Sequence, residues 1–338
     1  MSMDVVVCTR PGELALDRRE RPARGPGEVL IRVRRVGMCG TDYHIFRGTQ
    51  PYLEYPRIIG HELAGEIVEG DEAGRFAAGQ TVCVMPYLSC GDCNACRAGR
   101  TNCCTRLAVL GVHRDGGLAE YLAIDARFVI GAQGLSLDAA AMVEFLAIGR
   151  HAVGRSAARP GQRTLVAGAG PIGMAVTLFA ARRGDRVTVL DANAARAGFC
   201  FERLGCEAMV TTDEDVPARL SAISGGDMFD VVFDCTGSPA AMEAGFDYVA
   251  HGGSYVLVSV VSADIAFSDP EFHKREMALL GSRNATAADF EAVIAAIRAH
   301  EVPVEAMHTH SAPLAALPQA LGLWMRPETG VIKAIVAL

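Results

Sequence analysis

Apolar and polar positions alternate in the first third of the chain. Residues 27–36 read Gly-Glu-Val-Leu-Ile-Arg-Val-Arg-Arg-Val, a period of two that is typical of a half-buried strand. Other short β-rich runs lie between Gly and Pro turns and predict strands at Ala64–Glu69, Thr81–Val84 and Leu118–Ile124. We therefore expect the first 130 residues to be mainly β.

From about Gly161 the pattern changes to short apolar runs that alternate with helical stretches. This βαβ rhythm predicts a parallel sheet covered by helices on both faces. The predicted strands are Thr164–Ala167, Arg186–Leu190, Val231–Asp234, Ser254–Ser259 and Met277–Gly281. The predicted helices lie near 171–183, 194–204, 239–249 and 289–299.

The last stretch returns to short strands and ends in the apolar run Val331–Val336. We predict an α/β protein in which a β-rich domain, residues 1–146 and 300–338, is interrupted by a doubly wound domain, residues 147–299. A length of 338 residues fits two domains, because single cores rarely grow beyond about 200 residues.

Composition narrows the classes of function. A charged fraction of 21% and a hydrophobic fraction of 50% exclude a disordered chain, and a net charge of −7 argues against nucleic-acid or anionic-membrane partners. The N-terminal apolar run, Val5–Cys8, is too short for a signal peptide. The uncharged stretch Thr164–Ala181 has the length of a membrane span, but its glycines fit a turn described below. We expect a cytoplasmic protein with reduced thiols.

A glycine-rich turn joins the first strand of the doubly wound part to its helix. The turn reads Gly168-Ala169-Gly170-Pro171-Ile172-Gly173, in which glycines permit a tight turn and a close approach to a pyrophosphate. Asp191 ends the next strand, 18 positions beyond Gly173, where a carboxylate binds ribose hydroxyls and repels a 2′-phosphate. The pattern predicts NAD binding, with Arg196 added to the cofactor set; the alternative is an ordinary glycine-rich βα turn.

Five of the eleven cysteines lie within 15 residues: Cys90, Cys93, Cys96, Cys103 and Cys104. Three cysteines at this spacing, with a fourth from the same loop, suit a structural zinc. Iron–sulfur ligation and a disulfide are the alternatives, the second disfavoured by a reducing compartment. The spacing does not decide between Cys103 and Cys104.

Two further motifs carry zinc-ligand side chains: Cys39-Gly-Thr41-Asp42-Tyr43-His44 and Gly60-His61-Glu62. A catalytic zinc keeps three protein ligands and one open position. Each residue alone would more simply be a core cysteine or a hydrogen-bonded histidine, but their occurrence with a nicotinamide site favours ligation.

In this order, the four motifs resemble the zinc-dependent medium-chain dehydrogenases, most of all the sorbitol and threonine dehydrogenase branch. The resemblance implies a GroES-like catalytic domain, a Rossmann coenzyme domain and two zinc ions per subunit. The implied catalytic ligands are Cys39, His61 and Glu144, with Glu62 as a further ligand or a neighbouring carboxylate. The implied structural set is Cys90, Cys93, Cys96 and Cys104, and the implied proton relay is Thr41 and His44. Phe145 departs from the family, which usually has proline there; proline would fix the backbone beside Glu144.

The segments Gly99–Cys104, Gly111-Val112-His113, Ser268–Glu276 and Gly281–Thr286 are similar to bacterial dehydrogenases of L-galactonate and L-gulonate. This similarity implies oxidation of a secondary hydroxyl of a hexonate or polyol, with Arg283 as a candidate substrate contact. The alternatives are a sorbitol-like polyol dehydrogenase, an L-threonine 3-dehydrogenase and, from another class, a zinc-dependent binding or regulatory protein. The resemblance also implies a homo-oligomer, since members of the family are commonly dimers or tetramers, and we expect no nucleic-acid or membrane partner.

Overall fold

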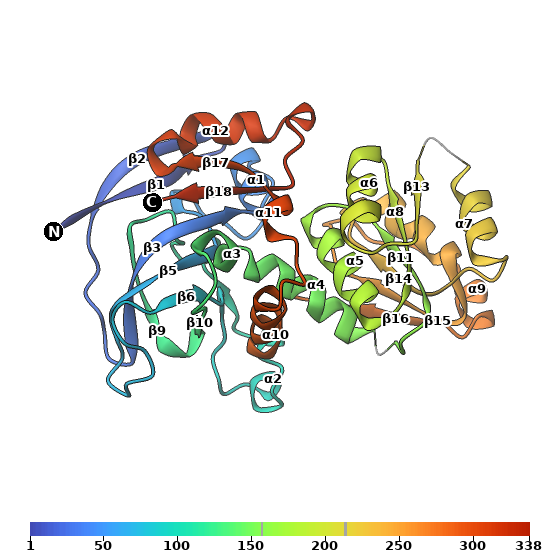
Figure 1. Ribbon diagram of the computed structural model, residues 1–338, viewed down its shortest axis with the longest axis horizontal. Helices are drawn as coiled ribbons and strands as arrows, with labels where there is room; N and C mark the ends of the chain where they lie inside the picture. The colour runs from blue at the N-terminus through green and yellow to red at the C-terminus, as the bar shows by residue number, and fades with distance from the viewer. Residues whose placement is uncertain (157, 213–214) are drawn as a thin grey trace. The chain divides into compact units, whose positions relative to one another are not determined.

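A computed structural model describes residues 1–156, 158–212 and 215–338, and the chain forms two compact units (Figure 1). The first unit comprises Met1–Glu144 and Thr286–Leu338, and the second comprises Phe145–Ala285. No helix within the described ranges is long and apolar enough to cross a membrane.

The boundary after the second unit differs from the one predicted at 299. Helix α10 (Ala287–Arg298) belongs with the first unit. Its Phe290 packs edge-on against Tyr87, with ring centroids 6.4 Å apart, and Arg298 Nη2 donates to the carbonyl oxygen of Gln133 at 2.6 Å. These contacts tie the helix to the β-rich unit, which its amphipathic sequence pattern alone does not indicate.

The first unit is mainly β, as the alternating sequence pattern predicts, and its strands pair antiparallel except for β17 and β18, which pair parallel. Its main sheet has the order β10-β6-β5-β3-β18-β17, with β9 paired to β3, and smaller sheets have the orders β2-β1-β4 and β7-β8. The C-terminal strand β18 inserts beside β3, so residues from both ends of the chain share one sheet. The strands are β1 (Ser2–Arg10), β2 (Glu13–Glu20), β3 (Glu28–Met38), β4 (Arg57–Ile58), β5 (Glu62–Glu69), β6 (Thr81–Val84), β7 (Tyr87–Leu88), β8 (Ala108–Val109), β9 (Tyr121–Asp125), β10 (Val129–Gly131), β17 (His308–Pro313) and β18 (Lys333–Ala337).

Apart from α10, the helices of this unit are short: α1 (Gly40–Arg47), α2 (Asn94–Arg97), α3 (Leu137–Ala141), α11 (Val304–Met307) and α12 (Leu317–Trp324). Helix α4 (Val143–Arg155) begins in this unit and belongs to the second unit from Phe145 onward. Helix α1 follows β3 directly, and the metal-ligand candidates lie around its N-terminus.

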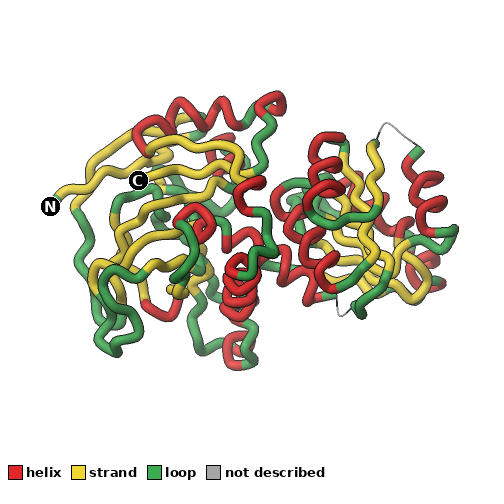
Figure 2. Tube along the Cα trace, viewed as in Figure 1, coloured by secondary structure: helices red, strands yellow, loops and turns green. Residues whose placement is uncertain are grey.

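The second unit is a parallel six-stranded sheet with the order β13-β12-β11-β14-β15-β16, and helices flank its strands (Figure 2). In chain order this is 3-2-1-4-5-6, the doubly wound topology of dinucleotide-binding domains. Buried side chains of its core include Leu165, Val232, Phe229 and Tyr255. Its elements are β11 (Arg163–Ala167), α5 (Pro171–Arg183), β12 (Arg186–Asp191), α6 (Ala194–Arg203), β13 (Ala208–Thr211), α7 (Val216–Ser224), β14 (Phe229–Asp234), α8 (Pro239–Ala244), β15 (Val249–Leu257), α9 (Asp269–Lys274) and β16 (Ala278–Gly281).

Three predicted elements differ most from the observed ones in their bounds. Strand β9 begins at Tyr121 rather than Leu118. The helix predicted over 239–249 ends at Ala244 and continues as a 3₁₀ turn to Tyr248. Strand β15 then begins at Val249, earlier than predicted, because a bulge between its pairs with Phe229 and Val231 lets the strand run through Gly252 and Gly253.

Candidate functional site

The N-terminus of α1 is organised by Asp42, which is fully buried. Its Oδ2 accepts the backbone N–H of Cys39 at 2.9 Å, and its Oδ1 accepts the backbone N–H of Gly60 at 3.1 Å. Cys39 is the N-cap of α1, and Gly60 immediately precedes His61. One carboxylate therefore fixes the two backbone segments that carry the candidate ligands, although the sequence motif gave Asp42 no role of its own.

Cys39, His61 and Glu62 come together in the first unit, with one potential ligand atom from each within 4.8 Å of the others. His61 and Glu62 are buried, whereas Cys39 is partly exposed. The His61 Nδ1 atom is buried without a hydrogen-bond partner and lies 3.7 Å from Asp42 Oδ1. A thiol, an imidazole and a carboxylate at this spacing form a donor set suited to Zn²⁺.

Glu62 is held by a lysine that the sequence motifs did not reveal. The Nζ atom of Lys333, on β18, lies 2.6 Å from both carboxylate oxygens of Glu62 and donates to the carbonyl oxygen of Met38 at 3.2 Å. Lys333 is 1% exposed and Glu62 is fully buried. A buried carboxylate and ammonium require each other, because either charge alone would be desolvated without compensation.

Glu144 lies in the first turn of α4 and has one oxygen bound and one free. Tyr87 donates its hydroxyl to Glu144 Oε1, and Glu144 Oε2 is buried without a partner. Burial raises the pKa of Glu144 to about 7, with the carboxylate of Glu62 adding to the rise and His61 opposing it. Phe145, which replaces the family's proline, is fully buried in the same helical turn. The free oxygen is an unsatisfied acceptor of the kind a cation would satisfy.

The proton-relay candidates lie on one face of α1. Thr41 and His44 are three residues apart, a spacing that places their side chains on the same side of a helix. His44 is exposed, and its Nδ1 lies 3.0 Å from the Thr49 hydroxyl. The pair thus extends from the partly exposed Thr41, two residues after Cys39, to the exposed His44.

The cysteine-rich loop brings four sulfurs together and leaves one aside. Cys90, Cys93, Cys96 and Cys104 lie within 4.8 Å of one another, whereas Cys103 is exposed and outside the group. The Cys104 and Cys90 sulfurs are 3.4 Å apart, and those of Cys90 and Cys96 are 3.9 Å apart. A tetrahedron of Zn–S bonds of about 2.3 Å has S–S edges of about 3.8 Å, so the sulfurs fit zinc.

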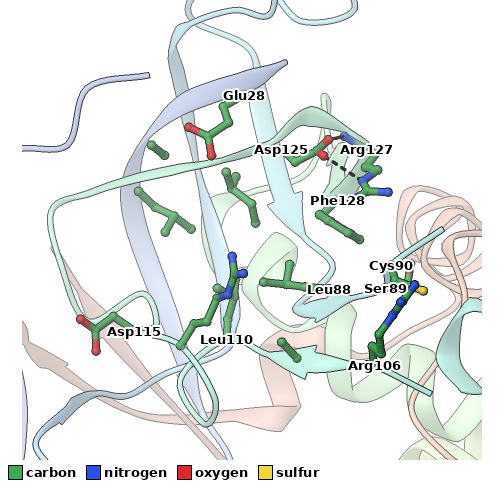
Figure 3. A pocket seen from close by; sticks show the side chains of 15 residues that line it. Glu28, Leu88, Ser89, Cys90, Arg106, Leu110, Asp115, Asp125, Arg127 and Phe128 are labelled. Atoms are coloured by element: carbon green, nitrogen blue, oxygen red, sulfur yellow. Dashed lines mark hydrogen bonds and ion pairs between the residues drawn. The ribbon is translucent and has the colours of Figure 1, made fainter. Parts of the chain in front are cut away.

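A cavity of about 600 Å³ adjoins this loop (Figure 3). Arg106 and Cys90 line one side of it, and the pair Asp125–Arg127, joined by a 2.8 Å contact, lines another. Arg106 is itself paired with Asp92. Two of the cavity's arginines therefore already have carboxylate partners.

The glycine-rich turn in the second unit has the backbone that a dinucleotide needs. Gly168 has φ of +93°, and a Cβ atom on Gly173 would lie 1.7 Å from the Gly168 carbonyl oxygen. Neither position accepts a side chain, so the strand, turn and helix α5 pack closely. Pro171 begins α5 and Ile172 follows it, so the helix N-terminus faces the turn.

A second cavity, of about 470 Å³, opens at this turn and contains several predicted cofactor residues. Asp191, at the end of β12, accepts the backbone N–H groups of Ala169 at 2.5 Å and Asn193 at 2.6 Å. The residues that line the cavity include Gly168, Gly170, Asp191, Arg196, Cys235, Thr236 and Ser238.

Thr236 and Ser238 are cavity residues that the sequence did not single out. Buried Asp234 accepts the Thr236 hydroxyl at 2.9 Å and the Ser259 hydroxyl at 2.6 Å. Asp234 therefore joins the loops that follow β14 and β15 at the carboxyl edge of the sheet. Arg283, the predicted substrate contact, is exposed between β16 and α10 in this second unit.

Sequence signals for the other unpredicted residues differ in strength. Lys333 is a lone charge in the apolar run Val331–Val336, a pattern that marks a buried ion pair or a functional group. Tyr87 carries no such signal, because its partner Glu144 is 57 residues away.

Comparison with known proteins identifies the class. Residues 25–134 match the family model described as the alcohol dehydrogenase GroES-like domain, and residues 171–299 match the model described as zinc-binding dehydrogenase. The chain belongs to the zinc-type alcohol dehydrogenase family and is an oxidoreductase.

Individual relatives are similar over most or all of the chain. It is 42% identical over 336 residues to L-galactonate-5-dehydrogenase of Escherichia coli K12, with 99% of both chains covered. It is 32% identical over 297 residues to 2-dehydro-3-deoxy-L-galactonate 5-dehydrogenase of Pseudoalteromonas atlantica, with 87% of each covered. A solved structure described as a short chain alcohol dehydrogenase from E. coli CFT073, complexed with NADH, has a TM-score of 0.92 and 28% identity, covering 100% of this chain and 99% of that one.

Proposed function

We propose that this dehydrogenase oxidises a secondary hydroxyl of a hexonate to a ketone and transfers the hydride to NAD. The observation that carries the proposal is the donor set of Cys39, His61 and Glu62, whose potential ligand atoms lie within 4.8 Å of one another, with the free oxygen of Glu144 as a further acceptor. A ligand set of this kind, with room for one exogenous ligand, is typical of a catalytic rather than a structural zinc.

Cys39, His61 and Glu144 would hold the catalytic zinc, and Cys90, Cys93, Cys96 and Cys104 the structural one. Both carboxylate oxygens of Glu62 are engaged by Lys333, whereas Glu144 Oε2 has no partner, so Glu144 is the better third ligand. When bound, zinc lowers the pKa of a substrate hydroxyl and NAD accepts the hydride. Lys333 keeps the Glu62 carboxylate ion-paired, which limits the negative charge that faces the catalytic zinc site.

Thr41 and His44 supply the route for the hydroxyl proton. The Thr41 hydroxyl can both accept and donate a proton, and His44 is exposed to solvent at the other end of the same helix face. An imidazole suits the last transfer because its ordinary pKa lies near neutral pH.

The cavity beside the glycine turn would hold the dinucleotide, with its pyrophosphate at the N-terminus of α5. The Asp191 carboxylate favours NAD, because its charge repels a 2′-phosphate and its oxygens accept ribose hydroxyls. Binding of NADH by the E. coli CFT073 relative supports this assignment.

The substrate class is supported by the relatives. Two of them are named as 5-dehydrogenases of L-galactonate and of 2-dehydro-3-deoxy-L-galactonate, both sugar acids.

We propose in addition that the enzyme works in the cytoplasm as a homo-oligomer, a dimer or tetramer. The two cysteine-containing ligand sets support a reducing compartment, because zinc binds thiolates rather than disulfides.

The proposal is tested by NADH formation from a panel of L-galactonate, L-gulonate, sorbitol and L-threonine, with and without a chelator. We expect turnover with one or both hexonates and its loss on chelation. Turnover confined to sorbitol or to L-threonine would show that the proposed substrate class is wrong, but it would leave the proposed zinc-dependent oxidation of an alcohol by NAD standing. Chelator-resistant turnover would refute the metal mechanism.

A further inference from the structure

An exposed aromatic pair in the first unit has no role in the site described above. The rings of Tyr52 and His113 stack with centroids 6.3 Å apart and an interplanar angle of 21°. Tyr52 is 69% exposed, and His113 is also exposed. A large aromatic ring presented to solvent beside a second ring offers a surface for a ligand, because the pair contributes little buried area to the core.

The orientation of the His113 ring is fixed by one residue. The backbone N–H of Val109 donates to the ring atom His113 Nδ1 at 3.1 Å, and the backbone N–H of His113 donates to the Val109 carbonyl oxygen at 2.9 Å. Because Nδ1 accepts a hydrogen bond, the ring proton resides on Nε2. His113 therefore offers a single, oriented N–H donor.

The loop that carries His113 lies along the segment leading to His61. Gly116 N–H donates to the Ile58 carbonyl oxygen at 2.7 Å, and Gly117 N–H donates to that of Gly60 at 2.9 Å. A Cβ atom on Gly116 would lie 2.2 Å from the Gly60 oxygen, so only glycine permits this approach. The His113 loop and the His61 segment thus form one packed structure.

Tyr52 is carried by the segment that follows α1. Tyr55, three residues later, donates its hydroxyl to the Ile45 carbonyl oxygen at 2.5 Å and anchors this segment to the helix that begins after Cys39. The aromatic pair is therefore supported by the same two backbone segments that deliver Cys39 and His61.

We propose that Tyr52 and His113 determine specificity by binding the carboxylate end of the substrate. The Tyr52 hydroxyl and His113 Nε2–H are both hydrogen-bond donors. A carboxylate accepts such hydrogen bonds more strongly than a neutral hydroxyl does. The pair then selects a hexonate over the hexitol with the same carbon skeleton. This inference rests on the proposed oxidation of a hexonate at the Cys39–His61 site.

The test compares L-galactonate with galactitol, the latter followed as a substrate or as a competitive inhibitor. For His113→Ala we expect the KM for L-galactonate to rise roughly tenfold to a hundredfold, the effect of losing a hydrogen bond to a charged group. The value of kcat and the affinities for galactitol and NADH should stay within about twofold, because the reacting atoms and cofactor are untouched. His113→Gln, which retains an N–H donor, should recover most of the loss, and Tyr52→Phe should give a smaller rise in KM.

His251→Ala is the matched control, since it removes an exposed histidine from the second unit. An unchanged KM for L-galactonate in His113→Ala and Tyr52→Phe, with wild-type turnover of this hexonate, would overturn the specificity role alone. An equal loss of L-galactonate and galactitol affinity, or no recovery in His113→Gln, would show a merely structural role. If the wild-type enzyme oxidises no hexonate, the proposed function fails and the inference fails with it.

Discussion

Asp42 is the residue on which the geometry of the candidate metal site depends most. It accepts the backbone N–H groups of Cys39 and Gly60 from a fully buried position. Its two hydrogen bonds join segments that precede α1 and β5, so the ligands Cys39 and His61 keep their spacing only while both bonds persist.

Asp42→Asn should therefore lower stability and metal content together. The amide would replace one acceptor oxygen with an N–H₂ group facing a backbone N–H, at a cost of about 1–3 kcal/mol in the free energy of unfolding. Chemical denaturation and zinc analysis of the same preparation measure the two effects. Asp17→Asn, at an exposed site on β2, is the control and should change neither. Full zinc content in Asp42→Asn would show that the bonds do not position the ligands.

The Lys333–Glu62 pair makes a second prediction at the residue scale. Lys333→Met leaves a buried carboxylate without its partner and should destabilise the fold by about 3–5 kcal/mol. The double variant Lys333→Met/Glu62→Gln removes both charges and should recover much of the loss. Denaturation curves of both single variants and the double variant give the coupling energy. Additive losses would contradict the assignment of an interdependent ion pair.

At the scale of elements, the cysteine-rich loop contains only a short helix, α2, and little regular structure. Backbone N–H groups of Cys96 and Thr105 lower the pKa of the Cys93 thiol to about 5, which favours the thiolate form that zinc binds. We therefore expect metal rather than packing to hold this loop.

Cys104→Ser should remove one zinc ion per chain and expose the loop to proteases, because only three thiolates remain. Cys103→Ser is a close control: the residue is adjacent, exposed and outside the four-sulfur group. Zinc analysis and limited proteolysis distinguish the two variants. Equal zinc content in Cys104→Ser and wild type would mean that the fourth ligand lies elsewhere.

The strand β12 and the turn beside it make a prediction about cofactor choice. Asp191→Ser removes the carboxylate that would repel a 2′-phosphate, so the ratio of kcat/KM for NAD to that for NADP should fall by roughly tenfold or more. Glu202→Ser, on the exposed side of α6, should leave the ratio unchanged. An unaltered preference in Asp191→Ser would remove this residue from cofactor discrimination.

At the scale of the whole molecule, local patterns predicted most of the architecture. Alternation over residues 27–36 corresponds to β3, and the glycine turn corresponds to the link between β11 and α5. These features are encoded by neighbouring residues. The placement of α10 with the β-rich unit depends on its contacts with Tyr87 and Gln133, which no local pattern contains.

In the candidate site too, some residues can be predicted from the local sequence and others cannot. Cys39, His61 and the four-cysteine set lie in short motifs whose residue types indicate metal binding. Lys333 and Tyr87 act through partners 271 and 57 residues away, so their roles follow from the sheet order and not from spacing. The choice between Glu62 and Glu144 as the third zinc ligand likewise depends on distant contacts, because Lys333 already engages both carboxylate oxygens of Glu62.

The most direct test of the zinc-dependent mechanism is NADH formation from L-galactonate by wild-type protein and by Cys39→Ala, measured on preparations of known zinc content. We expect two zinc ions per chain and turnover in the wild type. For Cys39→Ala we expect one zinc ion, unchanged NADH binding and no turnover. Turnover by Cys39→Ala at the wild-type rate, or a wild-type protein that is active after complete removal of zinc, would contradict this mechanism.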